Sequence, residues 1–149
     1  MEIYKLKWTR LQNEIFSFMC INAGQKFNMR GIARALKVSP TAISKAIKEL
    51  EKEKIVFIER AGAMNLTYVQ FNRDNERAVN LKRIENLRVI YESGLQNFLF
   101  EEFRGCTIIL FGSYSRGEDV WYGKMEERNS DIDIAIIGTK EKTVNLTEF

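Results

Sequence analysis

The chain has 149 residues, of which 45% are hydrophobic and 29% are charged, and its formal net charge is +3. An apolar share of this size is typical of a globular protein and excludes intrinsic disorder. The lack of histidine excludes histidine general-base chemistry, and two well-separated cysteines cannot form a zinc site. No apolar run approaches the roughly 20 residues that cross a membrane, so we expect no membrane contact. We expect a cytoplasmic protein in which Cys20 and Cys106 are reduced thiols.

Charge is distributed unevenly along the chain. Residues 1–71 carry 12 Lys and Arg against 6 Glu, whereas residues 72–149 carry 11 Lys and Arg against 14 Asp and Glu. A basic first half joined to an acidic second half indicates two domains with different partners. We therefore expect an α/β two-domain protein of the α+β type. Its boundaries would be 1–71 for the first domain, 72–93 for a helical connector and 94–149 for the second domain.

Three helices are predicted in the first half of the chain. The first has five apolar residues at helical spacing, namely Trp8, Leu11, Ile15, Phe18 and Ile21. Asn28 can cap the second helix, and Ser39 followed by Pro40 is a favourable start for the third. The inward face of the second helix would consist of Met29, Ile32, Ala33 and Leu36, and that of the third helix of Ile43, Ala46, Ile47 and Leu50.

The predicted outer face of the third helix is small, polar and basic. It consists of Thr41, Ser44, Lys45 and Lys48. Small hydroxyl side chains allow a helix to enter the DNA major groove, and lysines add phosphate contacts. Two strands then follow at residues 55–60 and 66–71, which predicts a hairpin with Arg60 at its base.

Two short helices, a tight turn, a third helix and a hairpin make this region, about residues 8–71, resemble the winged helix-turn-helix of prokaryotic transcription regulators. The resemblance is carried by the segment from Gly31 to Val56. It implies DNA as a partner, bound through five residues: Thr41, Ser44, Lys45, Lys48 and Arg60. Winged helices also serve as protein-contact modules, so that alternative stays open. Arg30 and Arg34 can reach phosphate, but an ordinary solvated face explains them equally well.

The connector is predicted to be a long amphipathic helix, because apolar residues recur every three or four positions from Leu81 to Phe98. Ser93-Gly94 would interrupt it, with Ser93 capping a second piece that ends at Phe103. The first piece would either pack on the winged helix or pair with its copy in a homodimer. We favour the homodimer, because helix-turn-helix proteins commonly place two recognition helices one DNA turn apart.

The second half contains an apolar run followed by a glycine and a serine. Thr107–Phe111 is short and rich in branched side chains, which predicts a buried strand. Gly112 has no Cβ and lets the backbone approach a ligand closely, and Ser113 adds a hydroxyl. A helix that started here would favour an anion such as phosphate at its first amide groups.

A second apolar run, Asn129–Gly138, carries two aspartates. If it is a strand, Asp131 and Asp133 project from the same face, because side chains alternate. Two like charges on an otherwise apolar strand repel each other unless a cation lies between them. Mg²⁺ suits this arrangement, since it takes one or two carboxylates and completes its shell with substrate phosphates.

The combination of Phe111-Gly112-Ser113, Arg116-Gly117 and Ser130–Ile134 resembles the nucleotidyltransferases of the DNA polymerase β superfamily, in particular the minimal nucleotidyltransferases of bacteria and archaea. The resemblance implies a mixed α/β sheet preceded by a helix. It also implies that Gly112, Ser113 and Arg116 hold a nucleoside triphosphate, and that Asp131 and Asp133 are catalytic ligands of Mg²⁺ or Mn²⁺.

Two features depart from this family pattern. The segment between Ser113 and Asp131 is longer than usual, and Val120–Arg128 is predicted to be an inserted loop whose charges, at Lys124 and Arg128, are solvated. The family also uses a third carboxylate on a later strand. The remaining acids, Glu141 and Glu148, lie on no recognisable strand. We expect either a sheet that is incomplete at the C-terminus, which we favour, or a domain that binds without catalysing.

Two hypotheses for function follow. The first is a DNA-binding nucleotidyltransferase that moves a nucleotidyl group from a Mg²⁺-bound nucleoside triphosphate to an acceptor hydroxyl and releases pyrophosphate. The alternative is a non-enzymatic transcription regulator or antitoxin-like protein. Its second domain would sense a nucleotide or bind a small helical partner protein.

Overall fold

The computed structural model describes residues 7–61, 66–124, 129–138 and 142–144. These residues fall into two compact units. The first unit draws on residues 1–78 and 120–129, and the second on residues 79–119 and 130–149. Helices and small antiparallel sheets make up both units, so the protein is of the α+β class. None of the described helices is both long and apolar enough to span a bilayer.

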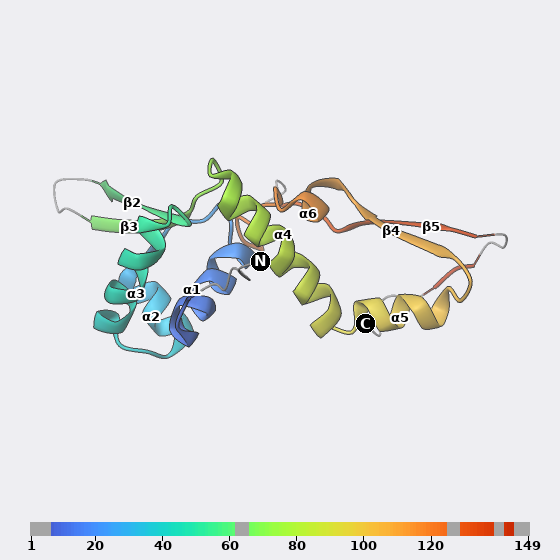
Figure 1. Ribbon diagram of the computed structural model, residues 1–149, viewed down its shortest axis with the longest axis horizontal. Helices are drawn as coiled ribbons and strands as arrows, with labels where there is room; N and C mark the ends of the chain where they lie inside the picture. The colour runs from blue at the N-terminus through green and yellow to red at the C-terminus, as the bar shows by residue number, and fades with distance from the viewer. Residues whose placement is uncertain (1–6, 62–65, 125–128, 139–141, 145–149) are drawn as a thin grey trace, which may run out of the picture. The chain divides into compact units, whose positions relative to one another are not determined.

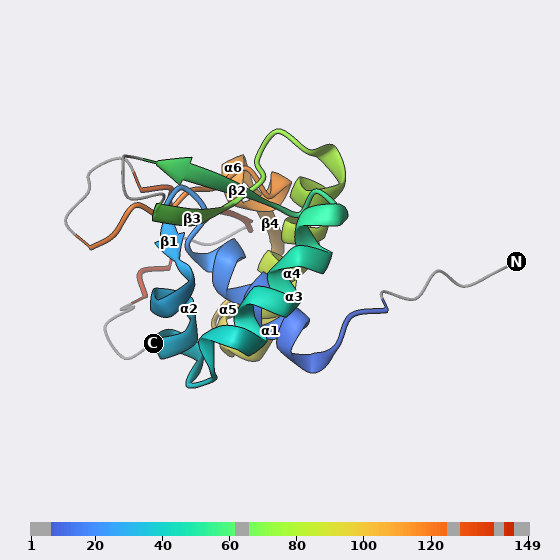
Figure 2. The same cartoon turned by 90° about the vertical axis from the view of Figure 1, so that its left-hand side faces the viewer.

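The first unit consists of α1 (Arg10–Ile21), β1 (Phe27–Asn28), α2 (Met29–Leu36), α3 (Pro40–Lys52), β2 (Val56–Ala61) and β3 (Leu66–Phe71). The three strands form an antiparallel sheet in the order β1-β3-β2. Figure 1 shows the β2–β3 hairpin, and Figure 2 shows the same unit with α1, α2 and α3 gathered next to the sheet.

Local sequence determines where the helices of this unit begin. Thr9 and Gln12 form a capping box at the start of α1. The Asn28 side chain accepts a hydrogen bond from the Gly31 amide at 2.7 Å at the start of α2. Ser39 caps α3 with Pro40 in its first turn. The predicted starts of the second and third helices are therefore confirmed.

The core of the first unit is apolar. Its largest fully buried side chains are Ile15, Met19, Cys20, Ile32, Ile43, Ile47, Leu50, Ile55, Val56 and Val69. The predicted inward face of α3 is buried in full, and Ile32 and Ala33 are buried on α2.

The predicted inward face of α1 was partly wrong. Ile21 is 58% exposed, whereas the buried residues are Gln12, Ile15, Phe16, Met19 and Cys20. The buried stripe runs through Ile15, Phe16 and Met19, so Leu11 and Phe18 of the predicted set are only half-buried. Trp8 precedes the helix and packs against Phe16 with the two rings tilted and their centroids 5.1 Å apart, and it donates a hydrogen bond to Glu53.

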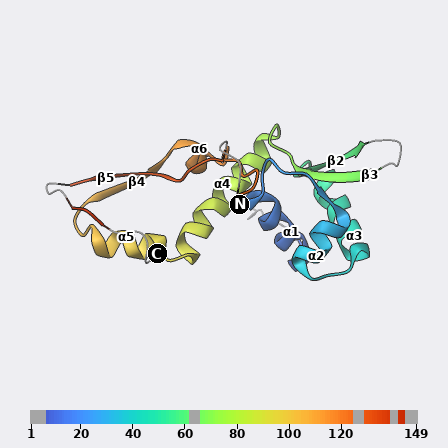
Figure 3. The same ribbon diagram turned by 180° about the vertical axis from the view of Figure 1, so that it is seen from behind.

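The second unit contains most of α4 (Glu76–Glu92), together with α5 (Leu95–Glu102), β4 (Thr107–Phe111), α6 (Gly112–Arg116) and β5 (Asp133–Ile137). β4 and β5 pair antiparallel, from Thr107 opposite Ile137 to Phe111 opposite Asp133. In Figure 3, which views the molecule from behind, α4 and α5 lie on one side of this two-stranded ribbon. The predicted strand after Cys106 and the break between the two helices are confirmed. The strand is not buried as predicted, because Ile109 and Phe111 lie on its outer face and are 41% and 49% exposed.

The apolar stripe of α4 is largely exposed in this chain. Ile84, Leu87 and Tyr91 are 66%, 47% and 56% exposed, whereas Lys82 and Asn86 are buried. The reason is that α4 turns a polar stripe toward the α6 region, where these side chains find hydrogen-bond partners.

The break between the helices differs in detail from the prediction. The N-cap of α5 is Gly94, in the left-handed region with φ +84°, rather than Ser93. The Ser93 hydroxyl instead donates to the Ile90 carbonyl at 3.1 Å. The two cysteines form no disulfide, as predicted, but Cys106 is only half-buried.

Candidate functional site

The exposed face of α3 carries the polar residues that the sequence singled out. Thr41, Lys45 and Lys48 are exposed, and Ser44 is half-buried. These four positions follow the i, i+3, i+4, i+7 spacing of one helical face, opposite the buried Ile47. A well-packed core therefore holds one polar, basic surface in place.

Ion pairs divide α3 into two parts. Near its C-terminal end, Lys52 pairs with Glu49 at 2.6 Å, and Glu53 pairs with Arg77 at 2.9 Å. Among the described residues, Lys45 and Lys48 take part in no ion pair. The first turns of the helix thus offer positive charge, while acids neutralise the last turn.

The α2–α3 turn and the hairpin extend the same basic character. Arg30, Arg34 and Lys37 are exposed on and after α2, and Lys37 adopts the left-handed conformation at the C-cap, with φ 56°. Arg60 is exposed on β2, opposite Thr67. The tip of the hairpin, residues 62–65, lies outside the described residues.

A second site lies where β4 ends. The register places Phe111 opposite Asp133, so Gly112 lies beside the Asp133 side chain. A Cβ on Gly112 would lie 1.9 Å from the Asp133 Oδ2 atom, and its φ is +72°. Both the close approach and the backbone conformation therefore require glycine at this position.

The other residues predicted for this site have different surroundings. Ser113 is half-buried in α6. Arg116 is exposed and pairs with Glu118 at 2.8 Å. Asp131 is exposed and precedes β5, which begins at Asp133. The strand is thus shorter than the predicted run, and the alternation of a strand positions only one of the two aspartates.

Metal binding here depends on few ligands. In the described parts of the chain, no group of three or more His, Cys, Asp or Glu side chains is arranged to hold a metal ion. Two carboxylates suffice for Mg²⁺ only when substrate phosphates and water complete its shell. Asp131 and Asp133 are of the right chemical type for that role. Glu141 and Glu148, considered above as a third carboxylate, lie outside the described residues.

Sequence reasoning missed a buried polar cluster that fastens α6 to α4. The fully buried Lys82 forms an ion pair with Asp119. The Asn86 side chain donates to Asp119 at 2.6 Å and to the Tyr114 carbonyl at 2.9 Å, and the Tyr114 hydroxyl donates to the Asn86 carbonyl at 3.2 Å. Burial, with the nearby charge of Asp119 and Glu85, raises the pKa of Tyr114 to about 12. The cluster fixes the segment that follows Gly112 and Ser113.

The sequence contains two weak signals of this cluster. Lys82 and Asn86 stand four residues apart on α4, so they share a face, but this spacing is common on solvated helices. A second signal is Gly117, where a Cβ would lie 2.4 Å from the Val79 carbonyl oxygen. Only the tertiary packing distinguishes the buried pair from a surface pair.

The predicted inserted loop packs on the first unit. The Trp121 amide donates to the Ala23 carbonyl at 2.7 Å, and the Tyr122 ring lies against Gly24. The Asn129 side chain closes the loop through the Tyr122 amide and the Gly123 carbonyl, both at 2.7 Å. The loop is therefore an anchored element, although Lys124 is exposed as predicted. Arg128 lies outside the described residues.

Comparison with known proteins gives a structural match. No protein-family model matches the chain, and no curated protein matches it. The adhesin competence repressor AdcR from Streptococcus pyogenes aligns with a TM-score of 0.51 and 22% identity, covering 68% of this chain and 71% of that one. A ZitR mutant from Lactococcus lactis, solved in complex with DNA, aligns with a TM-score of 0.50 and 22% identity, covering 70% of this chain and 68% of that one.

Likeness at this level of identity establishes a fold. The matched proteins are winged-helix proteins, and the order of helices and strands in the first unit agrees with that fold. The predicted winged helix-turn-helix is confirmed, while these matches lend no support to the nucleotidyltransferase resemblance of the second unit. We conclude that the chain carries a winged-helix fold whose third helix presents a basic, hydroxyl-bearing face.

Proposed function

We propose that the protein is a DNA-binding transcription regulator that inserts α3 into the major groove. The observation that carries this proposal is the division of charge along α3. Lys45 and Lys48 are exposed and take part in no ion pair within the described residues, whereas the Glu49–Lys52 pair lies at the end that would leave the groove. A protein of the same fold, ZitR, is solved in complex with DNA.

The physical basis is counterion release and groove readout. Each lysine that meets a phosphate releases condensed cations, which makes affinity depend on salt. Thr41 and Ser44 can approach base edges because their side chains are short. Arg60 on the hairpin and Arg30 and Arg34 on α2 would add backbone contacts.

The test is selection of a binding site from a random duplex library, followed by fluorescence anisotropy at several salt concentrations. Lys45→Ala should weaken binding and lower the slope of log affinity against log salt by about 1. Lys52→Ala is the matched control, since this lysine is on the same helix but is paired with Glu49. No selected sequence, or equal losses in both variants, would contradict the proposal.

A homodimer is part of this proposal. Ile84 and Leu87 are 66% and 47% exposed on α4, so this helix carries apolar surface that a second copy could cover. The selected site should then be palindromic, with half-sites one helical turn apart. Ile84→Glu should convert the dimer to a monomer in sedimentation velocity. A non-palindromic site together with a wild-type monomer would contradict the homodimer.

The second unit supports a second candidate function, binding of a nucleoside triphosphate with Mg²⁺. The favouring observation is the close approach of Gly112, directly after β4, and Asp133, at the start of β5, where a Cβ on Gly112 would meet the carboxylate. Gly112, Ser113 and Arg116 would hold the phosphates, and Asp131 and Asp133 would hold the cation. Nucleotidyl transfer to an acceptor, or a sensing role with a small helical partner protein, would build on this binding.

Calorimetric titration with ATP and GTP, with and without Mg²⁺, tests the second candidate. Binding that requires Mg²⁺ and is lost in Asp133→Asn would support it. Glu92→Gln is a suitable control, because this carboxylate of the second unit pairs with Arg88 on α4 and takes no part in the proposed site. Absence of heat with both nucleotides would remove this function and leave the DNA-binding proposal unaffected.

A further inference from the structure

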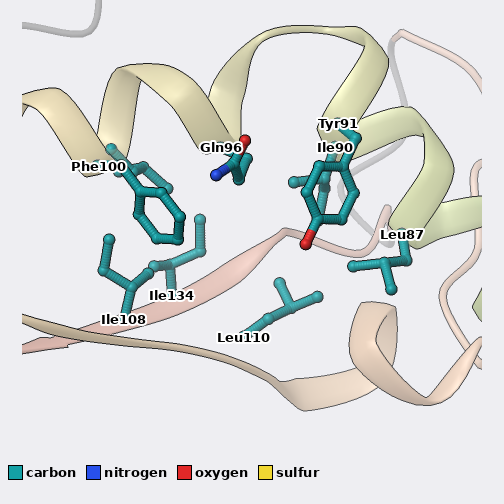
Figure 4. Close-up of a pocket in the computed structure, with 9 residues that line it drawn as sticks. Leu87, Ile90, Tyr91, Gln96, Phe100, Ile108, Leu110 and Ile134 are labelled. Carbon is teal, nitrogen blue, oxygen red and sulfur yellow. The ribbon is translucent and has the colours of Figure 1, made fainter.

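The second unit contains an apolar pocket, and of its lining residues only Leu87 belongs to the α4 surface that the homodimer above would cover. Its volume is about 150 Å³, and its walls come from α4, α5 and the β4–β5 ribbon. The residues that line it are Leu87, Ile90, Tyr91, Gln96, Leu99, Phe100, Ile108, Leu110 and Ile134. In Figure 4, Ile108, Leu110 and Ile134 form the floor on the ribbon, and Tyr91 and Phe100 reach toward it from the two helices.

The register of the ribbon explains why this face is apolar. Ile108 pairs with Ile136 and Leu110 pairs with Ile134, so these four side chains share the face that the helices cover. Ile109 lies on the opposite face of the same strand and is 41% exposed. The pocket is therefore a property of one face only.

Two polar groups lie among the apolar ones. Within the part of the chain that the structure describes, the Tyr91 hydroxyl and the Gln96 amide have no hydrogen-bond partner, and Figure 4 shows the Tyr91 hydroxyl pointing toward the ribbon. An apolar pocket with a few polar groups is the usual form of a small-molecule site. None of the nine lining residues is charged, so the pocket offers no counter-charge to an ionised ligand.

The size and shape of the pocket further restrict the kind of ligand that fits. Apolar cavities of about 150 Å³ accept a single benzene-sized ring. The aromatic rings of Tyr91 and Phe100 can pack against such a ring edge-to-face or offset. A nucleotide is too large and too highly charged for this space, so the pocket is distinct in chemistry from the Gly112–Asp133 site.

We propose that this pocket is a binding site for a small neutral aromatic molecule, the size of one substituted benzene ring, with one hydrogen-bonding group. The ring occupies the space above Leu110 and Ile134. Its polar substituent bonds to the Gln96 amide or the Tyr91 hydroxyl. All nine residues that line the pocket belong to the second unit.

The test uses phenol, toluene and benzoate as probes of the ¹⁵N-labelled full chain in NMR titrations. Phenol is expected to bind with a dissociation constant of roughly 1 mM, as suits a ligand of so few atoms. Toluene should bind more weakly than phenol, because it lacks the polar group, and benzoate should bind most weakly of the three. No saturable shift with phenol, or benzoate binding as tightly as phenol, would overturn the proposal.

Filling the pocket gives a second measurement. Leu110→Phe places a larger side chain in the pocket and should weaken phenol binding at least about 10-fold. Ile109→Phe, the neighbouring residue on the exposed face, should change it less than about two-fold. Equal phenol affinity in the wild type and both variants would overturn the site.

Two further variants keep the test decisive if Leu110→Phe fails to fold. Gln96→Leu should remove the preference for phenol over toluene while leaving toluene binding in place. Phe100→Ala, at a side chain 57% exposed, should enlarge the pocket and let 2-naphthol bind more tightly than phenol. Unchanged preferences in both variants would show that the probes bind elsewhere and would overturn the proposal.

Discussion

The two units of this protein are stabilised in different ways. In the first unit, the largest fully buried side chains are aliphatic, with Ile47 and Leu50 of α3 at 0% exposure. In the second unit, Lys82 is fully buried, while Ile109 and Phe111 are 41% and 49% exposed. The first unit therefore depends on apolar packing, and the second depends on a polar cluster under a partly open apolar layer.

The difference shows how each unit can respond to change. A close-packed apolar core resists deformation and holds a surface such as the α3 face in one geometry. A buried ion pair gains little net stability but penalises any arrangement that separates its partners. We expect the first unit to present a fixed binding surface and the second to open locally at lower free energy.

The largest expected effect is a cavity in the first core. Ile47→Ala should lower the free energy of unfolding of the first unit by about 3 kcal/mol, because a fully buried side chain is removed. Ile108→Ala, at a half-buried position in the second unit, should cost about 1 kcal/mol. Hydrogen exchange of the β3 and β4 amides measures the two units separately. Equal losses of unfolding free energy in the two variants would contradict the proposed difference between the units.

Breaking the buried ion pair should have nearly as large an effect on the second unit. Lys82→Ala leaves Asp119 without its cation and should cost about 3 kcal/mol. Arg10→Ala, which breaks the exposed pair with Glu14, should cost less than about 0.5 kcal/mol. The double variant Lys82→Met with Asp119→Leu should recover much of the loss. A small effect of Lys82→Ala in urea unfolding would contradict the role of the cluster.

The contact between Tyr122 and Gly24 gives a further test of packing in the first unit. A Cβ on Gly24 would lie 2.9 Å from the Tyr122 ring, and its φ is +111°. Gly123 has φ +122°, and apart from its chain neighbours no atom of the described residues lies within 4 Å of its Cβ position. Both alanine variants carry backbone strain, so Gly24→Ala should cost about 2 kcal/mol and Gly123→Ala about 1 kcal/mol. Truncating the Tyr122 side chain should remove the difference between the Gly24→Ala and Gly123→Ala variants, measured by thermal unfolding. Equal costs would mean that the ring contact contributes nothing.

The smallest expected effect concerns pH. The pKa of Tyr114 is raised from 10 to about 12, so its contribution to stability is present in full below pH 10 and is lost as pH rises to 12. Because the side chain is half-buried, the loss should be only about 1 kcal/mol. Tyr114→Phe should remove the loss of stability between pH 10 and pH 12, as measured by hydrogen exchange of the backbone amides of α6 and β4. An unchanged profile would contradict the assigned cause.

Much of the fold could be predicted from local sequence. Asn28, Ser39 and Pro40 fix the starts of α2 and α3 through short-range hydrogen bonds and a fixed φ, so they need no distant partner. The inward face of α3 follows from its period alone. The inward face of α1 and the buried polar side of α4 could not be predicted in this way, because both depend on distant residues. Trp8 bonds to Glu53, and Lys82 pairs with Asp119, 37 residues away.

The candidate sites likewise combine features that local sequence predicts with features that depend on tertiary contacts. Periodicity and residue type alone identified the polar face of α3, because that face is simply the side that the core does not use. For Gly112 and Asp133, the sequence supplied the residue types, and the pairing of β4 with β5 brought the two together. Asp131, which lies before the strand, lacks that constraint.

The sequence by itself determined the starts of α2 and α3, the strands of the hairpin and the basic face of α3, because these depend on contacts within a few residues and on the period of apolar side chains. The tertiary structure alone decided the burial of Lys82, the anchoring of Tyr122 on Gly24 and the pocket above Leu110. Each of these depends on contacts between residues far apart in the chain, and their cost or gain is set by burial, which only packing determines.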